Sequence, residues 1–130
     1  MFEQITRVLV VDDHAVVRKS LQALLERQPD MTVVGTAVNG REAIELAQST
    51  RPDVIIMDVS MPELDGIRAT REIHSLGLPA HIIMLSMHHN SALVEQARQN
   101  GASGYIIKQQ ANTDLVPAIR AACTGTLSFD

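Results

Sequence analysis

The stretch "VLVVDDHAVVRKSL", residues 8–21, joins the two patterns that decide the fold. Four branched apolar residues run directly into two adjacent acids, Asp12 and Asp13. A short apolar run of this kind predicts a buried strand. Apolar residues then recur at helical spacing over residues 14–28, with polar residues on the other face, which predicts an amphipathic helix. A buried strand followed at once by a helix is typical of a parallel β-sheet.

The same alternation of an apolar run and an amphipathic segment occurs five times along the chain. The predicted strands cover residues 7–11, 31–38, 52–58, 81–87 and 103–108. The predicted helices cover residues 14–28, 41–49, 66–76, 91–100 and a last segment capped by Asn112 or Thr113. Such alternation predicts an α/β fold, a doubly wound parallel sheet with helices on both faces. The second strand is less apolar and holds Gly35, as expected of an edge strand.

The composition limits the class of protein. A chain of 130 residues is expected to form one domain, and with 45% hydrophobic but only 2% aromatic residues its core must be aliphatic. The single cysteine, Cys123, excludes an internal disulfide framework and fits a reducing compartment. A net charge of −4 argues against direct binding of nucleic acid by this chain.

The sequence also lacks the patterns of a membrane or secreted protein. No apolar run approaches the roughly 18 residues that a membrane span needs. The N-terminal stretch "MFEQITR" has neither the basic region nor the apolar region of a signal peptide. We therefore expect a cytoplasmic protein with no membrane association.

Polar side chains stand at the ends of four of the five predicted strands. Asp12 and Asp13 follow the first strand, and Asp58, Ser86 and Lys108 end the third, fourth and fifth. In a doubly wound sheet, ligands bind outside the carboxyl ends of the strands. Three carboxylates at one edge repel one another, and a divalent cation with oxygen ligands, Mg²⁺ or Mn²⁺, relieves that repulsion. The sequence indicates no Cys/His ligand set at this edge.

This combination of groups suits phosphoryl chemistry, in which a protein mainly positions groups and neutralises charge. Asp58 would be the nucleophile, Lys108 and the metal the cations, and Ser86 a hydrogen-bond donor. Each residue alone has a simpler interpretation: Asp13 as the N-cap of the first helix, Asp58 as the start of a loop, Lys108 as a solvated strand end. Complementary groups at four strand ends together favour a site.

Four stretches resemble the receiver domain of two-component response regulators. They are "VLVVDDH" (8–14), "PDVIIMDVSMPELDG" (52–66), "IIMLSM" (82–87) and "GASGYIIK" (101–108). The resemblance covers residues 6–124 and implies a flavodoxin-like (CheY-like) five-stranded parallel sheet, strand order 2-1-3-4-5, with five helices. It implies that residues 1–130 are a single receiver domain.

The resemblance also implies roles for the acids. Asp58 would accept a phosphoryl group from the phosphohistidine of a sensor histidine kinase. Asp12 and Asp13 would hold Mg²⁺ (or Mn²⁺), Asp13 most directly, together with Asp58 and the backbone carbonyl of Ser60. Ser60 also occupies a position that tunes dephosphorylation in receivers.

Further roles follow from the same resemblance. Ser86, Lys108 and the backbone of Met87 would contact the bound phosphoryl group. Ser86 and Tyr105 match the hydroxyl and aromatic pair whose movement switches receivers. His88 occupies a second position that tunes dephosphorylation.

The stretches "DDHAVVRKSLQALLE", "LSMHHN" and "AIRAACTGTLSFD" are most similar to the NarL/FixJ type of regulator. This implies a C-terminal LuxR-type helix-turn-helix domain beyond Asp130 in the full-length protein, DNA contact only through that domain, and a phosphorylation-dependent homodimer. The alternatives are a stand-alone receiver acting by protein contacts and a small Mg²⁺-dependent aspartyl phosphatase. Such phosphatases need a second acid where Ser60 stands, so we expect a signalling domain with only self-phosphorylation and self-dephosphorylation, not an enzyme.

Overall fold

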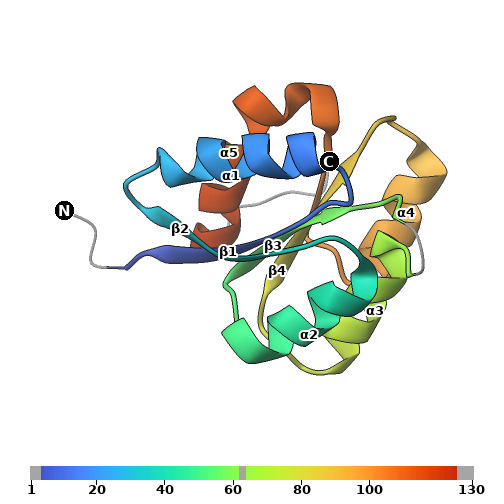
Figure 1. The fold of residues 1–130 in the computed structure, drawn as a ribbon. Helices are drawn as coiled ribbons and strands as arrows, with labels where there is room; N and C mark the ends of the chain where they lie inside the picture. The colour runs from blue at the N-terminus through green and yellow to red at the C-terminus, as the bar shows by residue number, and fades with distance from the viewer. Residues whose placement is uncertain (1–3, 62–63, 126–130) are drawn as a thin grey trace.

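The structure, a computed structural model, describes residues 4–61 and 64–125 (Figure 1). Strands and helices alternate along the chain, as the sequence predicts. In chain order the elements are β1 (Thr6–Val11), α1 (Ala15–Glu26), β2 (Met31–Ala37), α2 (Gly40–Thr50), β3 (Val54–Asp58), α3 (Gly66–Ser75), β4 (His81–Ser86), α4 (Ser91–Gln99), β5 (Gly104–Ile107), the 3₁₀ turn η1 (Lys108–Gln110) and α5 (Ala111–Thr124).

The five strands form one parallel sheet in the order β2-β1-β3-β4-β5, which confirms the expected flavodoxin-like topology. Helices α1 and α5 cover one face, and α2, α3 and α4 cover the other (Figure 1). The expectation that β2 is an edge strand is confirmed. Its pairing with β1 shifts register between Val8 and Leu9, opposite the segment that holds Gly35, and a glycine in a strand often accompanies such a bulge.

Alternate residues of the central strands supply two aliphatic cores, one on each face of the sheet. In β1, Val8 and Val10 pack toward α1 and α5, while Leu9 and Val11 pack toward α2 and α3, and all four are fully buried. Burial of one such side chain contributes roughly 1.5–3 kcal/mol to folding. The core is therefore aliphatic, as the composition predicts, and it holds the carboxyl ends of the strands at one edge.

The helices are short, from 9 to 14 residues. In the part of the chain that the structure describes, none combines the length and the apolar character needed to cross a lipid bilayer. The predicted cap of the last helix at Asn112 or Thr113 is wrong. Helix α5 begins at Ala111 and its N-cap residue is Gln110, because the 3₁₀ turn after β5 leads the chain directly into the helix.

The start of α3 lies against the backbone of the strand that carries Asp58. The Gly66 amide donates to the carbonyl of Val59 at 3.0 Å. A Cβ atom at Gly66 would lie 1.9 Å from the Asp58 carbonyl oxygen, which is closer than any side chain can approach. Glycine at this position therefore lets α3 begin directly beside the end of β3.

We predict that Gly66→Ala destabilises the protein by about 2 kcal/mol or more, because the added methyl group forces the Asp58 backbone to move. The free energy of unfolding in urea measures this effect. Gly35→Ala is the matched control: its Cβ would meet Leu9 at 3.4 Å, an ordinary contact, and it should cost less than about 1 kcal/mol. Equal losses in the two variants would contradict the close-approach argument.

Candidate functional site

Two carboxylates are buried side by side at the carboxyl edge of the sheet. Asp58 ends β3 and is 2% exposed, and Asp12 directly follows β1 and is fully buried. The β1–β3 register pairs Val11 with Met57, so the next residue on each strand is one of these acids. Buried carboxylates need compensating partners.

Lys108 provides the cationic partner. It follows β5, the edge strand that lies two places from β3 in the sheet. Its Nζ atom lies 3.0 Å from Asp12 Oδ2 and 3.2 Å from Asp58 Oδ1. Burial works to lower the pKa of Lys108, but hydrogen bonds and the charges of Asp12 and Asp58 outweigh it and raise the pKa. Lys108 is therefore a permanent cation, placed where β5 ends and the 3₁₀ turn begins.

One lysine does not fully compensate the acids. Burial, and after it the charge of Asp12, raises the pKa of Asp58 from 3.8 to about 6, although Lys108 and the backbone N–H of Ser60 act in the opposite direction. The Ser60 amide donates to Asp58 Oδ1 at 3.2 Å. The site keeps a surplus of negative charge near neutral pH.

Some acceptor oxygens of the site lack hydrogen bonds. Among the described residues, Asp58 Oδ2 is buried without a hydrogen-bond partner. Asp12 Oδ2 and Asp13 Oδ1 make ion-pair contacts with Lys108 Nζ and His14 Nδ1 but no well-aligned hydrogen bond. One potential ligand atom each of Asp12, Asp13, His14 and Asp58 lies within 4.8 Å of the others. These residues fit a divalent cation, and their carboxylate oxygens suit Mg²⁺ or Mn²⁺.

His14 belongs to this cluster, although the sequence pattern does not indicate it. Its Nδ1 atom lies 3.2 Å from Asp12 Oδ1 and 3.2 Å from Asp13 Oδ1. His14, not Asp13, is the N-cap residue of α1, and its side chain caps no backbone group, so the N-cap interpretation of Asp13 is wrong. The loop is held instead by Asp12, whose Oδ1 accepts from the His14 amide at 2.8 Å and whose carbonyl accepts from Arg18 at 2.8 Å.

Most of the remaining predicted residues surround a cavity of about 240 Å³ beside Asp58. Ser86 is buried at the end of β4, and its Oγ accepts from the His88 amide at 3.2 Å. The residues that line the cavity are His14, Asp58, Val59, Ser60, Ser86, Met87, His88, Leu93 and Lys108. The structure thus brings Ser60, Ser86, Met87, His88 and Lys108 together around Asp58.

Tyr105 does not line this cavity. The register of β5 pairs it with Met84, two residues before Ser86. Its hydroxyl donates to the carbonyl of His88 at 3.3 Å. Since Ser86 Oγ accepts from the amide of the same residue, the two predicted switch residues both bind the backbone of His88.

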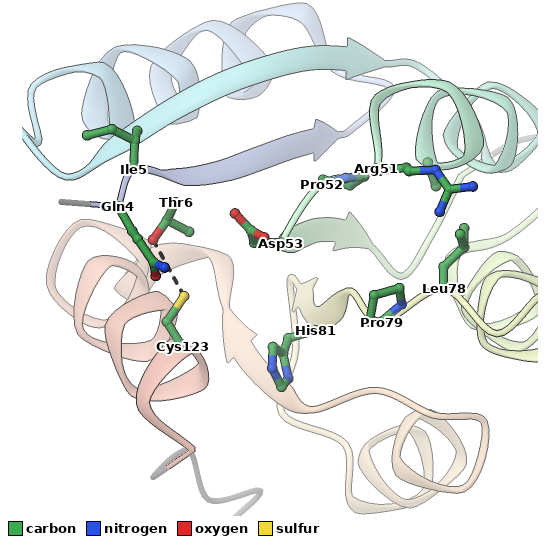
Figure 2. Close-up of a pocket in the computed structure, with 11 residues that line it drawn as sticks. Gln4, Ile5, Thr6, Arg51, Pro52, Asp53, Leu78, Pro79, His81 and Cys123 are labelled. Atoms are coloured by element: carbon green, nitrogen blue, oxygen red, sulfur yellow. Dashed lines mark hydrogen bonds between the residues drawn. The ribbon is translucent and has the colours of Figure 1, made fainter.

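A larger cavity, of about 340 Å³, lies at the opposite edge of the sheet, where the strands begin (Figure 2). Asp53, His81 and Cys123 lie around it (Figure 2). Asp53 Oδ2 accepts from the Arg7 amide at 2.8 Å, and Cys123 Sγ lies 3.5 Å from the hydroxyl of Thr6. Asp53 therefore serves mainly to join two strand starts, and the acidic cluster at the carboxyl edge is the better candidate site.

Comparison with known proteins agrees with this geometry. The response regulator receiver domain family matches residues 8–120. The nitrate/nitrite response regulator NarL of Escherichia coli K12 is 35% identical over 120 residues, which are 92% of this chain and 56% of NarL. The chain thus spans a little over half the length of such curated relatives.

Two solved structures are also similar. A two-component response regulator of the LuxR family from an Aurantimonas species has a TM-score of 0.90 and 39% identity, over 95% of this chain and 89% of that one. The isolated receiver domain of RcsB from Salmonella enterica serovar Typhimurium, solved in the presence of the phosphomimetic BeF₃⁻, has a TM-score of 0.88 and 28% identity, over 98% and 94%.

We predict that Asp58 makes the metal-free protein less stable as pH rises from about 4 to about 6. The folded protein holds this proton more tightly than the unfolded chain, whose pKa is near 3.8, so the free energy of unfolding falls across that window. In urea unfolding with a chelator present, the free energy of unfolding of Asp58→Asn should increase relative to that of the wild type as pH rises. The difference between the two curves isolates the Asp58 carboxyl, because the variant has no group that titrates at this position. Parallel curves for Asp58→Asn would contradict the assigned pKa.

Proposed function

The chain belongs to the response-regulator receiver domain family, and we propose that it is the Mg²⁺-dependent phospho-acceptor of a two-component signalling pathway. The observation that carries the proposal is the state of Asp58, which lines a cavity. Its Oδ2 atom is buried and has no hydrogen-bond partner among the described residues. The cationic Nζ of Lys108 lies 3.2 Å from the other oxygen of the same carboxylate. A nucleophile beside a fixed cation suits attack on phosphorus.

The reaction follows from the placement of these groups. An oxygen of Asp58 attacks the phosphorus of a phosphohistidine on a sensor histidine kinase. The O–P bond forms as the P–N bond breaks, and the released imidazole keeps the electron pair and takes up a proton. Lys108 neutralises charge on the phosphoryl oxygens, and the hydroxyl of Ser86 and the backbone N–H of Met87 donate hydrogen bonds to them.

Asp12, Asp13 and Asp58 would hold the metal ion, Asp13 most directly, with the backbone carbonyl of Ser60 as a further ligand. The fit rests on the carboxylate oxygens that lack a hydrogen bond and on a donor set dominated by carboxylates. A bound Mg²⁺ or Mn²⁺ ion would neutralise the charge that the phosphoryl group adds.

The output of the phosphorylated state would pass through Ser86 and Tyr105. Both bind the backbone of His88, so a change at Ser86 reaches Tyr105 through one residue. Ser60 and His88 both line the cavity beside Asp58, where their side chains would control access of the water that hydrolyses the phosphoryl group.

The curated relatives support a transcriptional output. We propose that residues 1–130 are one receiver domain of a longer cytoplasmic regulator, with a C-terminal LuxR-type helix-turn-helix domain that contacts DNA. The response regulator NarL is longer than this chain, which matches 56% of it, and the Aurantimonas relative is of the LuxR family. The phosphorylated protein would form a homodimer. A stand-alone receiver is the second candidate; the phosphatase is disfavoured because Ser60 replaces the acid its leaving group would need.

We predict that acetyl phosphate and Mg²⁺ place one phosphoryl group on the wild-type chain and none on Asp58→Asn. Intact-mass spectrometry measures the product. Asp53→Asn removes a carboxylate from the opposite edge of the sheet and should be labelled like the wild type. Labelling of Asp58→Asn to the wild-type extent would exclude Asp58 as the acceptor. Rapid turnover of small phosphomonoesters by the wild type would instead favour the phosphatase.

We also predict that Asp13→Asn weakens Mg²⁺ binding by about tenfold or more, because it removes a charged ligand while Lys108 stays paired with the other acids. Calorimetric titration measures the affinity. Asp114→Asn changes the net charge equally at an exposed position of α5 and is the control. An unchanged Mg²⁺ affinity in Asp13→Asn would remove Asp13 from the metal site.

A further inference from the structure

The His14 side chain lies beside the acids of the candidate metal site. Its Nδ1 atom lies 3.2 Å from one carboxylate oxygen of Asp12 and from one of Asp13. Neighbouring ligand atoms of an octahedral ion with bonds of about 2.1 Å lie roughly 3.0 Å apart. The two nitrogen–oxygen spacings therefore match two edges of a coordination shell, and His14 completes the four-residue cluster with Asp58.

Among the described residues, the His14 ring makes polar contacts only with the acids of this cluster: its Nδ1 atom forms a hydrogen bond with Asp12 Oδ1 at 3.2 Å, which coordination of a cation would replace. The side chain is 64% exposed and does not cap α1, whereas the backbone is fixed by the hydrogen bond from its amide to Asp12 Oδ1. A neutral imidazole with its proton on Nε2 offers the lone pair of Nδ1 to a cation.

A second observation indicates that this cluster accommodates a ligand. Asp58 Oδ2 is buried and has no hydrogen-bond partner among the described residues, although Asp58 is only 2% exposed. Lys108 pairs with the other oxygen of Asp58, at 3.2 Å. A positive ion bound by Asp13 and His14 would supply the partner that Asp58 Oδ2 lacks.

We propose that His14 Nδ1 is a nitrogen ligand of the metal site, and that it makes the site favour first-row ions such as Mn²⁺ and Co²⁺ over Mg²⁺. This rests on the metal site of the proposed function and adds to its ligand set. Mg²⁺ is a hard ion that binds oxygen, whereas imidazole suits first-row transition ions and affinity rises along the series from Mn²⁺ to Co²⁺ and beyond. One nitrogen among oxygens therefore raises affinity for those ions and changes Mg²⁺ affinity little.

The test compares the wild-type chain with His14→Gln by calorimetric titration with Mg²⁺, Mn²⁺ and Co²⁺. We expect the variant to lose about tenfold or more in Co²⁺ affinity, a smaller factor for Mn²⁺, and less than about twofold for Mg²⁺. His89→Gln removes an exposed histidine outside the cluster and should leave all three affinities unchanged.

A spectroscopic measurement tests the ligand directly. Electron spin echo envelope modulation of the Mn²⁺-loaded wild type should show ¹⁴N coupling from a coordinated imidazole, and His14→Gln should lose it. Absence of ¹⁴N coupling in the wild type overturns the proposal without any variant. Equal loss of Mg²⁺ and Co²⁺ affinity in His14→Gln also overturns it, since His14 would then only shape the loop.

These outcomes separate the inference from the proposed function. If Asp58→Asn is still phosphorylated while the wild type shows ¹⁴N coupling, the phospho-acceptor assignment fails and the ligand assignment stands. If Asp58 is the acceptor and no nitrogen coordinates Mn²⁺, the proposed function stands and His14 is not a ligand.

Discussion

Lys108 lies between Asp12 and Asp58, at 3.0 and 3.2 Å, in an interior where both carboxylates are almost wholly shielded from water. Removing such charges from water costs several kcal/mol per ion, and their mutual attraction offsets this only where every charge is paired. Here one cation serves two buried acids, with Asp13 beside them. The remaining negative charge helps to raise the pKa of Asp58, and a divalent cation would relieve it. Such an arrangement costs stability, and buried groups with perturbed pKa values of this kind are typical of functional sites.

The parallel sheet converts positions far apart in the chain into one site. Neighbouring parallel strands end at the same edge, so a residue that follows β1 meets one that ends β3, and the register of Val11 with Met57 gives this pairing. The sequence alone therefore predicts that Asp12, Asp58, Ser86 and Lys108 converge. Apolar runs mark where the strands end, and helical connections between parallel strands bring those ends to one edge of the sheet. The edge position of β2 was likewise foreseeable from Gly35.

The sequence could not place the groups whose positions depend on individual torsion angles. The position of His14 Nδ1 depends on a loop residue with φ −93° and ψ 115° and on the turn that Asp12 Oδ1 makes with its amide. Apolar periodicity carries no information about such a residue, and the pattern predicts only that a helix starts at His14. The start of α5 was misplaced for the same reason, because the pattern does not reveal a 3₁₀ turn after β5. Binary patterning specifies elements, and local hydrogen bonds specify their ends.

Under the proposed function, the backbone of His88 connects phosphorylation of Asp58 to the surface formed by α4 and β5. Its amide donates to Ser86 Oγ, and its carbonyl accepts from the Tyr105 hydroxyl. A hydroxyl has one proton and two acceptor sites, so Ser86 can donate to a phosphoryl oxygen while it still accepts from His88. The hydrogen bond from His88 can therefore persist when Ser86 turns its hydroxyl toward a phosphoryl group on Asp58. If the His88 amide follows Ser86, the carbonyl of the same residue, which accepts from Tyr105, moves with it. Since α4 begins at Ser91, shortly after His88, the displacement reaches both α4 and β5.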